Sequence, residues 1–317
     1  MYRNPPWTRE TLGNHGGHAL EFRPGEPHKL WPLTRCVSLE VEICGSNGDK
    51  SSDNIFKTGA YKGQAKDRYK HLRKYLKEDG KKILCVSDGS LPQGGYELNL
   101  VPSSGNKWVE QLTGLNAALK ADDAFVTSEA GMHCHVDTRD LRDDDAALLR
   151  LCTLYSKLET SLFSIVEPTR RNNSYCTKVG NNMAKVLKEA ADPDVQKRYK
   201  KGSDAIHKAI YGLIPDTDEA KRRIDEMKRN RHVTHYWALN MHSHFYRGSV
   251  EFRIHHGTVD RKQWLNWSLV CASIVEFAKK RSDAECEAVT PNLEGLKSIL
   301  PSELCRKWVD TRAEALK

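Results

Sequence analysis

The chain has 317 residues, enough for one large domain with a substantial core or for two small domains. It contains no apolar run near the roughly 20 residues that a membrane-spanning helix needs, and its first residues form no apolar signal segment. The formal charge of +8 suits anionic substrates or nucleic acid, and equally a solubilising surface. Nine scattered cysteines without C-x-x-C pairs indicate reduced thiols. We therefore expect a soluble cytoplasmic protein.

The predicted elements begin after an irregular N-terminal extension, residues 1–33, which is rich in Pro, Gly, His and Trp. In CVSLEVEIC, residues 36–44, apolar and polar side chains alternate. This pattern predicts a half-buried strand with Glu40 and Glu42 opposite its apolar face. The next predicted elements are a basic helix at 60–79, strands at 82–88 and 96–102, a helix at 105–121, a strand at 131–138 and a helix at 143–166.

The second half of the chain contains a segment that interrupts the strand pattern. Residues 178–231 are polar and rich in Lys and Arg, and we interpret them as a basic helical insertion. The elements predicted after it are strands at 235–242 and 248–256, a helix at 261–280 and two short final helices. The sum is an α+β fold of mostly antiparallel strands backed by helices, predicted to form one domain over residues 34–317.

Three predicted strands carry charged or coordinating side chains at every second position, so each row occupies one face of its strand. The rows are Glu40 and Glu42; His133, His135 and Asp137; and Glu251, Arg253 and His255. Such a face cannot be an ordinary core, because burying unpaired charges is costly. Carboxylates with a few imidazoles favour Mg²⁺ or Mn²⁺ over Zn²⁺. Arginines among them indicate an anion, most naturally phosphate.

Simpler interpretations exist for several of these residues. Asp137 can cap the turn that follows its strand. Asp88 is either a turn residue or a distant metal contact, and Glu97 can pair with a surface lysine. Arg170 and Arg171 follow a proline at a helix end, where cations suit the helix dipole alone. We therefore expect at most one of these two arginines to reach an active site.

Together, the spaced motifs resemble the amidoligase family, a branch of the glutamine synthetase and glutamate–cysteine ligase superfamily of carboxylate–amine ligases. The motifs are an E-x-E strand, S-D-G-S, a G-x-H-x-H-x-D strand, R-R-x-N-x-Y-C and E-F-R-x-x-x-G-T. The resemblance covers residues 34–280 apart from the basic insertion. It implies a curved antiparallel sheet of the glutamine synthetase type, backed by helices.

The resemblance also implies roles for particular residues. The implied metal ligands are Glu40, Glu42, Glu97, His133 and Glu251. The implied nucleotide-binding residues are His133, His135 and Arg253. The implied catalytic arginines are Arg170, Arg171 and Arg253. The implied cofactors are ATP and Mg²⁺ or Mn²⁺.

The activity implied by the resemblance is ATP-dependent ligation. A substrate carboxylate takes the γ-phosphoryl group of ATP, and an amine then displaces phosphate from the acyl phosphate to form an amide. From the residues alone, two other interpretations stay open: a metal-dependent hydrolase built on the His-x-His strand, and a nucleic-acid-binding protein that uses the basic insertion. No motif identifies the carboxylate and amine, small or macromolecular, or specifies an oligomer, and we expect no membrane partner.

Overall fold

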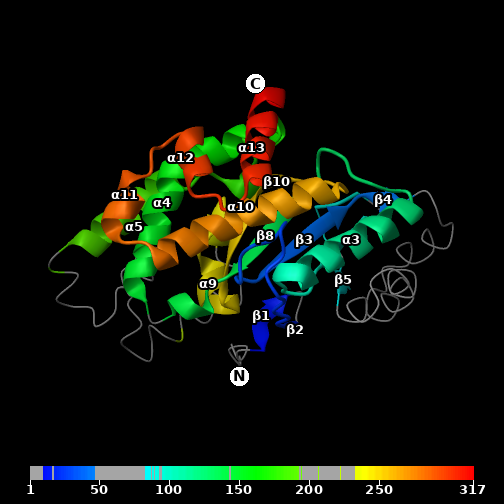
Figure 1. The fold of residues 1–317 in the computed structure, drawn as a ribbon, viewed down its shortest axis with the longest axis horizontal. Coiled ribbons are helices and arrows are strands. Elements are labelled where there is room, and N and C mark those ends of the chain that lie inside the picture. The colour runs from blue at the N-terminus through cyan, green and yellow to red at the C-terminus, as the bar shows by residue number, and fades with distance from the viewer. Residues whose placement is uncertain are drawn as a thin grey trace. The chain divides into compact units, whose positions relative to one another are not determined.

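The structure is a computed structural model (Figure 1). It describes residues 10–15, 18–46, 83–86, 88, 90–92, 95–142, 144–192, 194, 206, 222 and 233–317. These residues form helices and antiparallel strands, which confirms the predicted α+β class. None of the helices in the described ranges is long and apolar enough to cross a membrane.

The chain divides into two compact units. The described residues within 7–136 and 254–272 are called the sheet unit, and those within 137–253 and 273–317 the helical unit. The single domain predicted over 34–317 and the glutamine synthetase type of sheet stay predictions.

Four strands form the sheet of the sheet unit, in the order β5-β6-β3-β8. Their bounds are β5 Leu84–Val86, β6 Tyr96–Asn99, β3 Val37–Ile43 and β8 Gly131–Asp137. All three pairings are antiparallel. One face of this sheet is apolar and fully buried, with the side chains of Val37, Leu39, Val41, Ile43, Leu98, Met132, Cys134 and Val136.

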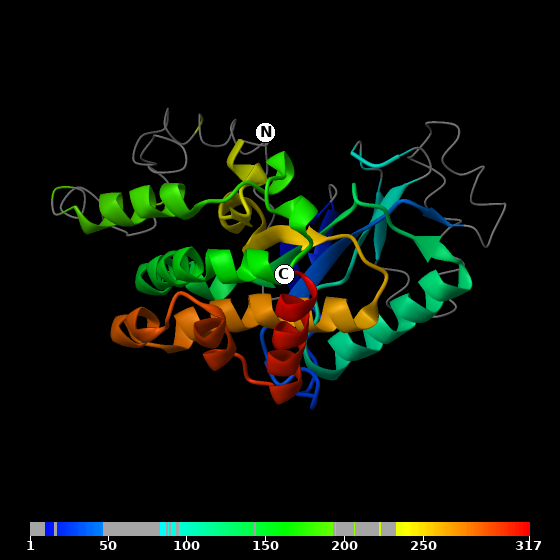
Figure 2. The same ribbon diagram turned by 90° about the horizontal axis from the view of Figure 1, so that it is seen from above.

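Helix α3 (Gly105–Ala121) has the bounds that the sequence predicts and runs beside β3 in both views (Figures 1 and 2). Its buried apolar side chains recur at helical spacing, at Trp108, Leu112, Leu115 and Leu119. The indole nitrogen of Trp108 donates to the Ser268 hydroxyl of α10 (Arg261–Lys280) at 3.1 Å. The apolar side of α3 is thus buried within the sheet unit, as its amphipathic pattern predicts.

Strand β3 differs from its prediction in exposure. Residues 36–44 were expected to be half-buried, but all seven residues of β3 are buried, with Glu40 only 7% and Glu42 only 4% exposed. Carboxylates tolerate burial only when they have partners. The strand register supplies these partners, because Glu40 lies opposite His133 on β8 and opposite Asn99 on β6.

The N-terminal segment, expected to be irregular, contains an antiparallel strand pair. Strands β1 (Thr11–His15) and β2 (His18–Glu21) bring Leu12 opposite Leu20, and both leucines are buried. Trp31 is also fully buried, and its ring meets that of the tryptophan in α3 edge to face at 6.1 Å. Apolar anchors therefore order a segment that has no clear periodicity. A second short pair joins β4 (Gly45–Ser46) and β7 (Ala124–Phe125).

The helical unit is built around α4 (Asp145–Ser164), which the sequence predicts over 143–166. The Asp144 side chain caps this helix by accepting from the Ala147 amide at 3.0 Å. Helices α11 (Asp283–Ala288) and α12 (Leu293–Ser298) pack on α4. The remaining helices are α5 (Gly180–Ala191), α9 (His242–Arg247), α13 (Glu303–Ala315) and the end of α10.

Two predictions for the helical unit are wrong in detail. The chain ends with three helices where two were expected, because Ser282, Asn292 and Ser302 each cap a new start. The strand predicted over 235–242 shrinks to β9 (Leu239–Asn240), which pairs with β10 (Ser249–His256).

The rest of that predicted strand is helical. A 3₁₀ turn, Val233–Tyr236, precedes β9, and α9 follows it. Gly248, with φ of 85°, then ends α9 in the left-handed conformation that glycine favours. Of the basic insertion at 178–231, the structure describes 178–192, 194, 206 and 222, including α5. The rest of it, and the helix predicted at 60–79, lie outside the described residues.

Candidate active site

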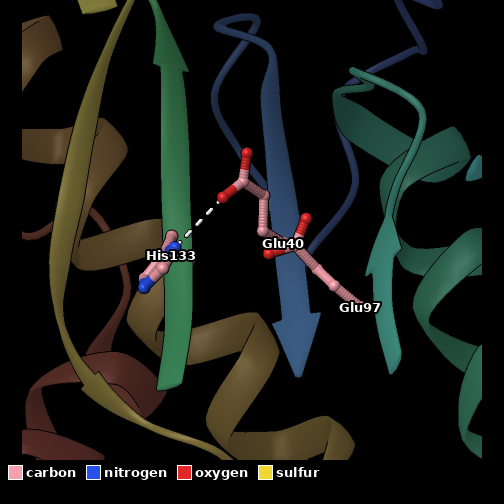
Figure 3. Close-up of side chains that lie close together, drawn as sticks. All are labelled: Glu40, Glu97 and His133. Atoms are coloured by element: carbon pink, nitrogen blue, oxygen red, sulfur yellow. Dashed lines mark hydrogen bonds and ion pairs between the residues drawn. The ribbon is translucent and has the colours of Figure 1, made fainter. Parts of the chain in front are cut away.

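Three neighbouring strands of the sheet unit bring acidic and imidazole side chains together on one face. Glu40 lies opposite His133, and Glu42 lies opposite Glu97. Residues opposite each other in an antiparallel pair share a face, and Figure 3 shows Glu40 and Glu97 approaching each other while Glu40 reaches His133. We call this surface the polar face. It consists of Ser38, Glu40, Glu42, Glu97, Asn99, His133 and His135, all buried.

The Glu40 carboxylate contacts two imidazole rings. Its Oε2 lies 3.0 Å from Nδ1 of His133, and its Oε1 lies 3.1 Å from Nε2 of His135. Glu42 approaches the same cluster, with Oε1 3.7 Å from Nε2 of His133. The other oxygen of Glu42 accepts the backbone N–H of Gly131. The two carboxylates and a backbone amide thus fix both rings of the His-x-His strand.

The carboxyl group of Glu97 is buried close to three other carboxyl groups. Burial raises the pKa of its carboxyl well above the ordinary value, and the charges of Glu40, Glu42 and Asp88 raise this pKa further. The Asn99 amide opposes the rise by donating to Glu97 Oε1 at 2.9 Å. A cation bound among these carboxyl groups would favour their ionised forms and offset their mutual repulsion.

Among the described residues of the sheet unit, two overlapping groups of side chains offer metal-ligating atoms within 4.8 Å of one another. One group is Glu40, Glu97 and His133, and the other is Glu42, Asp88 and Glu97. Glu97 belongs to both groups. Carboxylate oxygens with one imidazole form the donor set that suits Mg²⁺ or Mn²⁺. Asp88 belongs to the second group and also makes the contacts of a turn residue. Its Oδ1 accepts hydrogen bonds from the amide and the hydroxyl of Ser90, each at 2.7 Å.

A second cluster lies in the helical unit around β10. The Arg253 guanidinium donates through Nη1 to Glu251 Oε1, and the Asn240 amide donates to Glu251 Oε2 at 2.7 Å. Arg253 Nε also donates to the backbone carbonyl of Tyr175 at 3.1 Å. The side chains of Glu251 and Arg253 are only 4% and 11% exposed. This carboxylate is therefore neutralised within its own unit.

The two predicted catalytic arginines of the R-R motif separate. Arg170 is buried, and its Nη2 donates to the backbone carbonyl of Arg253 at 2.9 Å. Arg171 instead donates to the carbonyls of Phe163 at 3.3 Å and Leu316 at 3.0 Å. The structure thus brings Arg170, and not Arg171, to the second cluster. The functional roles of all these residues stay predictions.

Two further residues of the polar strands have structural partners. Asp137 accepts from the backbone N–H of Arg139 at 3.1 Å and binds its guanidinium in two places, at 2.8 and 2.7 Å. Its contacts are those of the turn cap considered from the sequence. Asn99 is predicted from the alternation of its strand to share a face with Glu97, but the sequence assigns it no functional role. Because side chains of a strand alternate between its two faces, the position of Asn99 two residues after Glu97 indicates that both lie on the same face.

Comparison with known protein families identifies the family of this chain. The family model described as "Putative amidoligase enzyme" matches residues 35–275, which is more than half of the chain and includes both clusters. Among curated proteins, the comparison found none that matches this chain. The chain therefore belongs to the amidoligase family, a family of enzymes named for forming amide bonds.

Proposed function

We propose that this protein is an ATP-dependent ligase that joins a carboxylate to an amine through an acyl phosphate. The observation that carries the proposal is the group of Glu40, Glu97 and His133, which offers ligand atoms within 4.8 Å on a buried face. Membership of an amidoligase family supports an amide-forming reaction. Activating a carboxylate requires energy from a second substrate, and transfer of a phosphoryl group from ATP supplies it.

The polar face fits one or more Mg²⁺ or Mn²⁺ ions. Glu40, Glu42, Glu97 and Asp88 provide hard oxygen ligands, and His133 provides one nitrogen ligand. When bound, such an ion neutralises charge on the nucleotide phosphates and on the transferred phosphoryl group. Glu40 holds the rings of His133 and His135, and carboxylates that orient imidazoles in this way tune metal sites.

The second cluster supports recognition of an anion. Arg253 is held by Glu251 and by the Tyr175 carbonyl, so its guanidinium has little freedom. A guanidinium fixed in this way binds a phosphate or a substrate carboxylate with defined geometry. Arg170 supports the backbone of Arg253, and we assign it a positioning role. Arg171 has its partners elsewhere and is not part of the proposed machinery.

A zinc hydrolase fits the structure less well. Such an enzyme would use His133, His135 and Asp137 as ligands, but Asp137 is committed to a bidentate pair with Arg139. Both imidazoles contact Glu40, and carboxylates outnumber imidazoles on the polar face. That composition favours harder cations than zinc.

The proposal is tested with hydroxylamine, which traps acyl phosphates as hydroxamates. The purified protein is incubated with ATP, Mg²⁺ and a panel of carboxylic acids, and ADP and hydroxamate are measured together. We expect both products for at least one class of acid, and neither product with the Glu40→Gln variant. The matched control is Glu110→Gln on α3, whose side chain is 61% exposed, and it should retain full activity. Undiminished turnover by Glu40→Gln would contradict the proposal.

A further inference from the structure

Asn99 of β6 has a side-chain arrangement that its neighbours do not explain. The residue is fully buried on the polar face and lies directly opposite Glu40. Its Nδ2 donates to Glu97 Oε1 at 2.9 Å. Its Oδ1 is buried and has no hydrogen-bond partner within the part of the chain that the structure describes. Buried amide oxygens almost always have a partner, so this atom calls for a ligand.

The surroundings of this oxygen indicate what kind of ligand it takes. With a cation bound, the carboxylates of Glu40 and Glu97 are ionised and only accept hydrogen bonds, so they cannot satisfy another acceptor. Because the amide nitrogen is directed to Glu97, the amide oxygen occupies the opposite arm of the same planar group. An amide oxygen among carboxylates is a normal ligand of hard divalent cations.

We propose that Asn99 is an oxygen ligand of the cation held by Glu40 and Glu97, and that its amide nitrogen positions the Glu97 carboxylate for that cation. The inference rests on the cation site of the proposed function and adds a residue that the family resemblance did not supply. A neutral oxygen here adds a ligand without adding a further negative charge to the carboxylates of Glu40, Glu42, Glu97 and Asp88. The side chain thereby limits the repulsion that the site experiences before a cation binds.

The test measures Mn²⁺ binding to the full chain, with and without ADP. Free Mn²⁺ is followed by electron paramagnetic resonance, and water-proton relaxation reports the number of water molecules bound to the protein-held ion. In Asn99→Ala we expect about 10-fold or greater loss of Mn²⁺ affinity, together with one more bound water in place of the amide oxygen. In Asn99→Asp, which retains an oxygen ligand but loses the donor to Glu97, we expect a smaller loss of affinity than in Asn99→Ala and an unchanged water number.

The matched control is Asn106→Ala. Asn106 belongs to the same unit and also has a buried Oδ1 without a partner among the described residues, but it lies in the first turn of α3. Its substitution should change neither Mn²⁺ affinity nor the number of bound waters.

Each outcome separates this inference from the proposed function. If the wild-type protein binds no Mn²⁺ under either condition, the cation site of the proposed function is wrong. If Glu40→Gln abolishes binding while Asn99→Ala leaves affinity and water number unchanged, only the role of Asn99 is wrong. Weaker binding of Asn99→Ala without an additional water would show a purely structural role and overturn the ligand assignment. Should Asn99→Ala not fold, Asn99→Asp decides, because an affinity loss as large as that of Glu97→Gln overturns the proposal.

Discussion

The polar face and the cluster around β10 accommodate buried carboxylates in opposite ways. On the polar face, Glu97 lies near Glu40, Glu42 and Asp88, and burial together with these like charges raises its pKa. Around β10, Glu251 is neutralised by Arg253 and receives a further hydrogen bond from Asn240. The difference teaches that buried carboxylates of one chain can have their charge offset in different ways. A bound cation would offset the charge of a carboxylate among carboxylates, whereas Glu251 already has a guanidinium in contact.

The largest expected effect comes from removing one charge from the polar face. Glu97→Gln should lower turnover by on the order of 10²–10³-fold, because an electrostatic contact to the reacting phosphoryl group is lost. Without added cation, and at a pH above the raised pKa of Glu97, the same change should raise the melting temperature, since it removes a buried charge and its repulsion from Glu40, Glu42 and Asp88. ADP release and thermal unfolding measure the two effects. A lower melting temperature would contradict the contrast between the clusters.

The corresponding change in the helical unit should have the opposite effect on stability. Glu251→Gln leaves the guanidinium of Arg253, 11% exposed, without its charged partner. Uncompensated buried charges are strongly unfavourable, so we expect the free energy of unfolding to fall by about 3 kcal/mol. Urea denaturation measures it. The double substitution Glu251→Gln with Arg253→Met should recover part of the loss, and no recovery would show that packing, not charge, is responsible.

A buried histidine of the helical unit should make stability depend on pH. Burial lowers the pKa of His244 from 6.5 to about 4, and its Nδ1 lies 2.8 Å from the Thr138 hydroxyl. Asp140 favours the charged ring and Arg142 disfavours it. As pH falls below 6.5, His244 becomes protonated in the unfolded chain but stays neutral in the folded chain until the pH approaches 4. Stability therefore falls, by about 2 kcal/mol at pH 5.

Denaturation at several pH values tests this prediction. His244→Asn retains a polar group near Thr138 but does not titrate. It should flatten the pH dependence between pH 4 and 6.5. An unchanged slope would mean that other groups cause the acid sensitivity.

The smallest expected effect concerns a third way of accommodating a carboxylate. Glu159 of α4 is buried and accepts the backbone N–H groups of Val179 at 2.7 Å and Gly180 at 3.0 Å, at the start of α5. In Glu159→Gln the side-chain NH2 group cannot accept a hydrogen bond from a backbone N–H. We therefore expect the free energy of unfolding to fall by about 1 kcal/mol, comparable to the loss of a helix cap. Hydrogen exchange of α5 should accelerate more than that of α4. Equal acceleration would indicate global destabilisation.

Local patterns of the sequence predicted most elements and the identity of much of the polar face. Alternation in VSLEVEI placed Glu40 and Glu42 on one face of β3, and the helical spacing of α3 gave its bounds. The pairing of Glu42 with Glu97 depends on strand register, which no local pattern specifies. The burial of both glutamates also escaped prediction, because it follows from partners on other strands.

Other features depended on tertiary contacts that the sequence does not display. Residues 235–242 have strand composition, but the left-handed Gly248 and the packing of α9 override this propensity. The separation of Arg170 from Arg171 required knowing which carbonyl groups lie nearby. The alternation of 96–102 placed Asn99 on the face of Glu97, but its unpartnered amide oxygen could be recognised only from the structure.

The double contact of Glu40 with His133 and His135 has a consequence for how these positions can vary. A change at Glu40 removes one contact from each ring at once, so a later substitution of either histidine removes fewer contacts than it would in the wild-type protein. Effects of combined substitutions should therefore be far from additive. A functional replacement of Glu40 should therefore require compensating substitutions at His133 and His135.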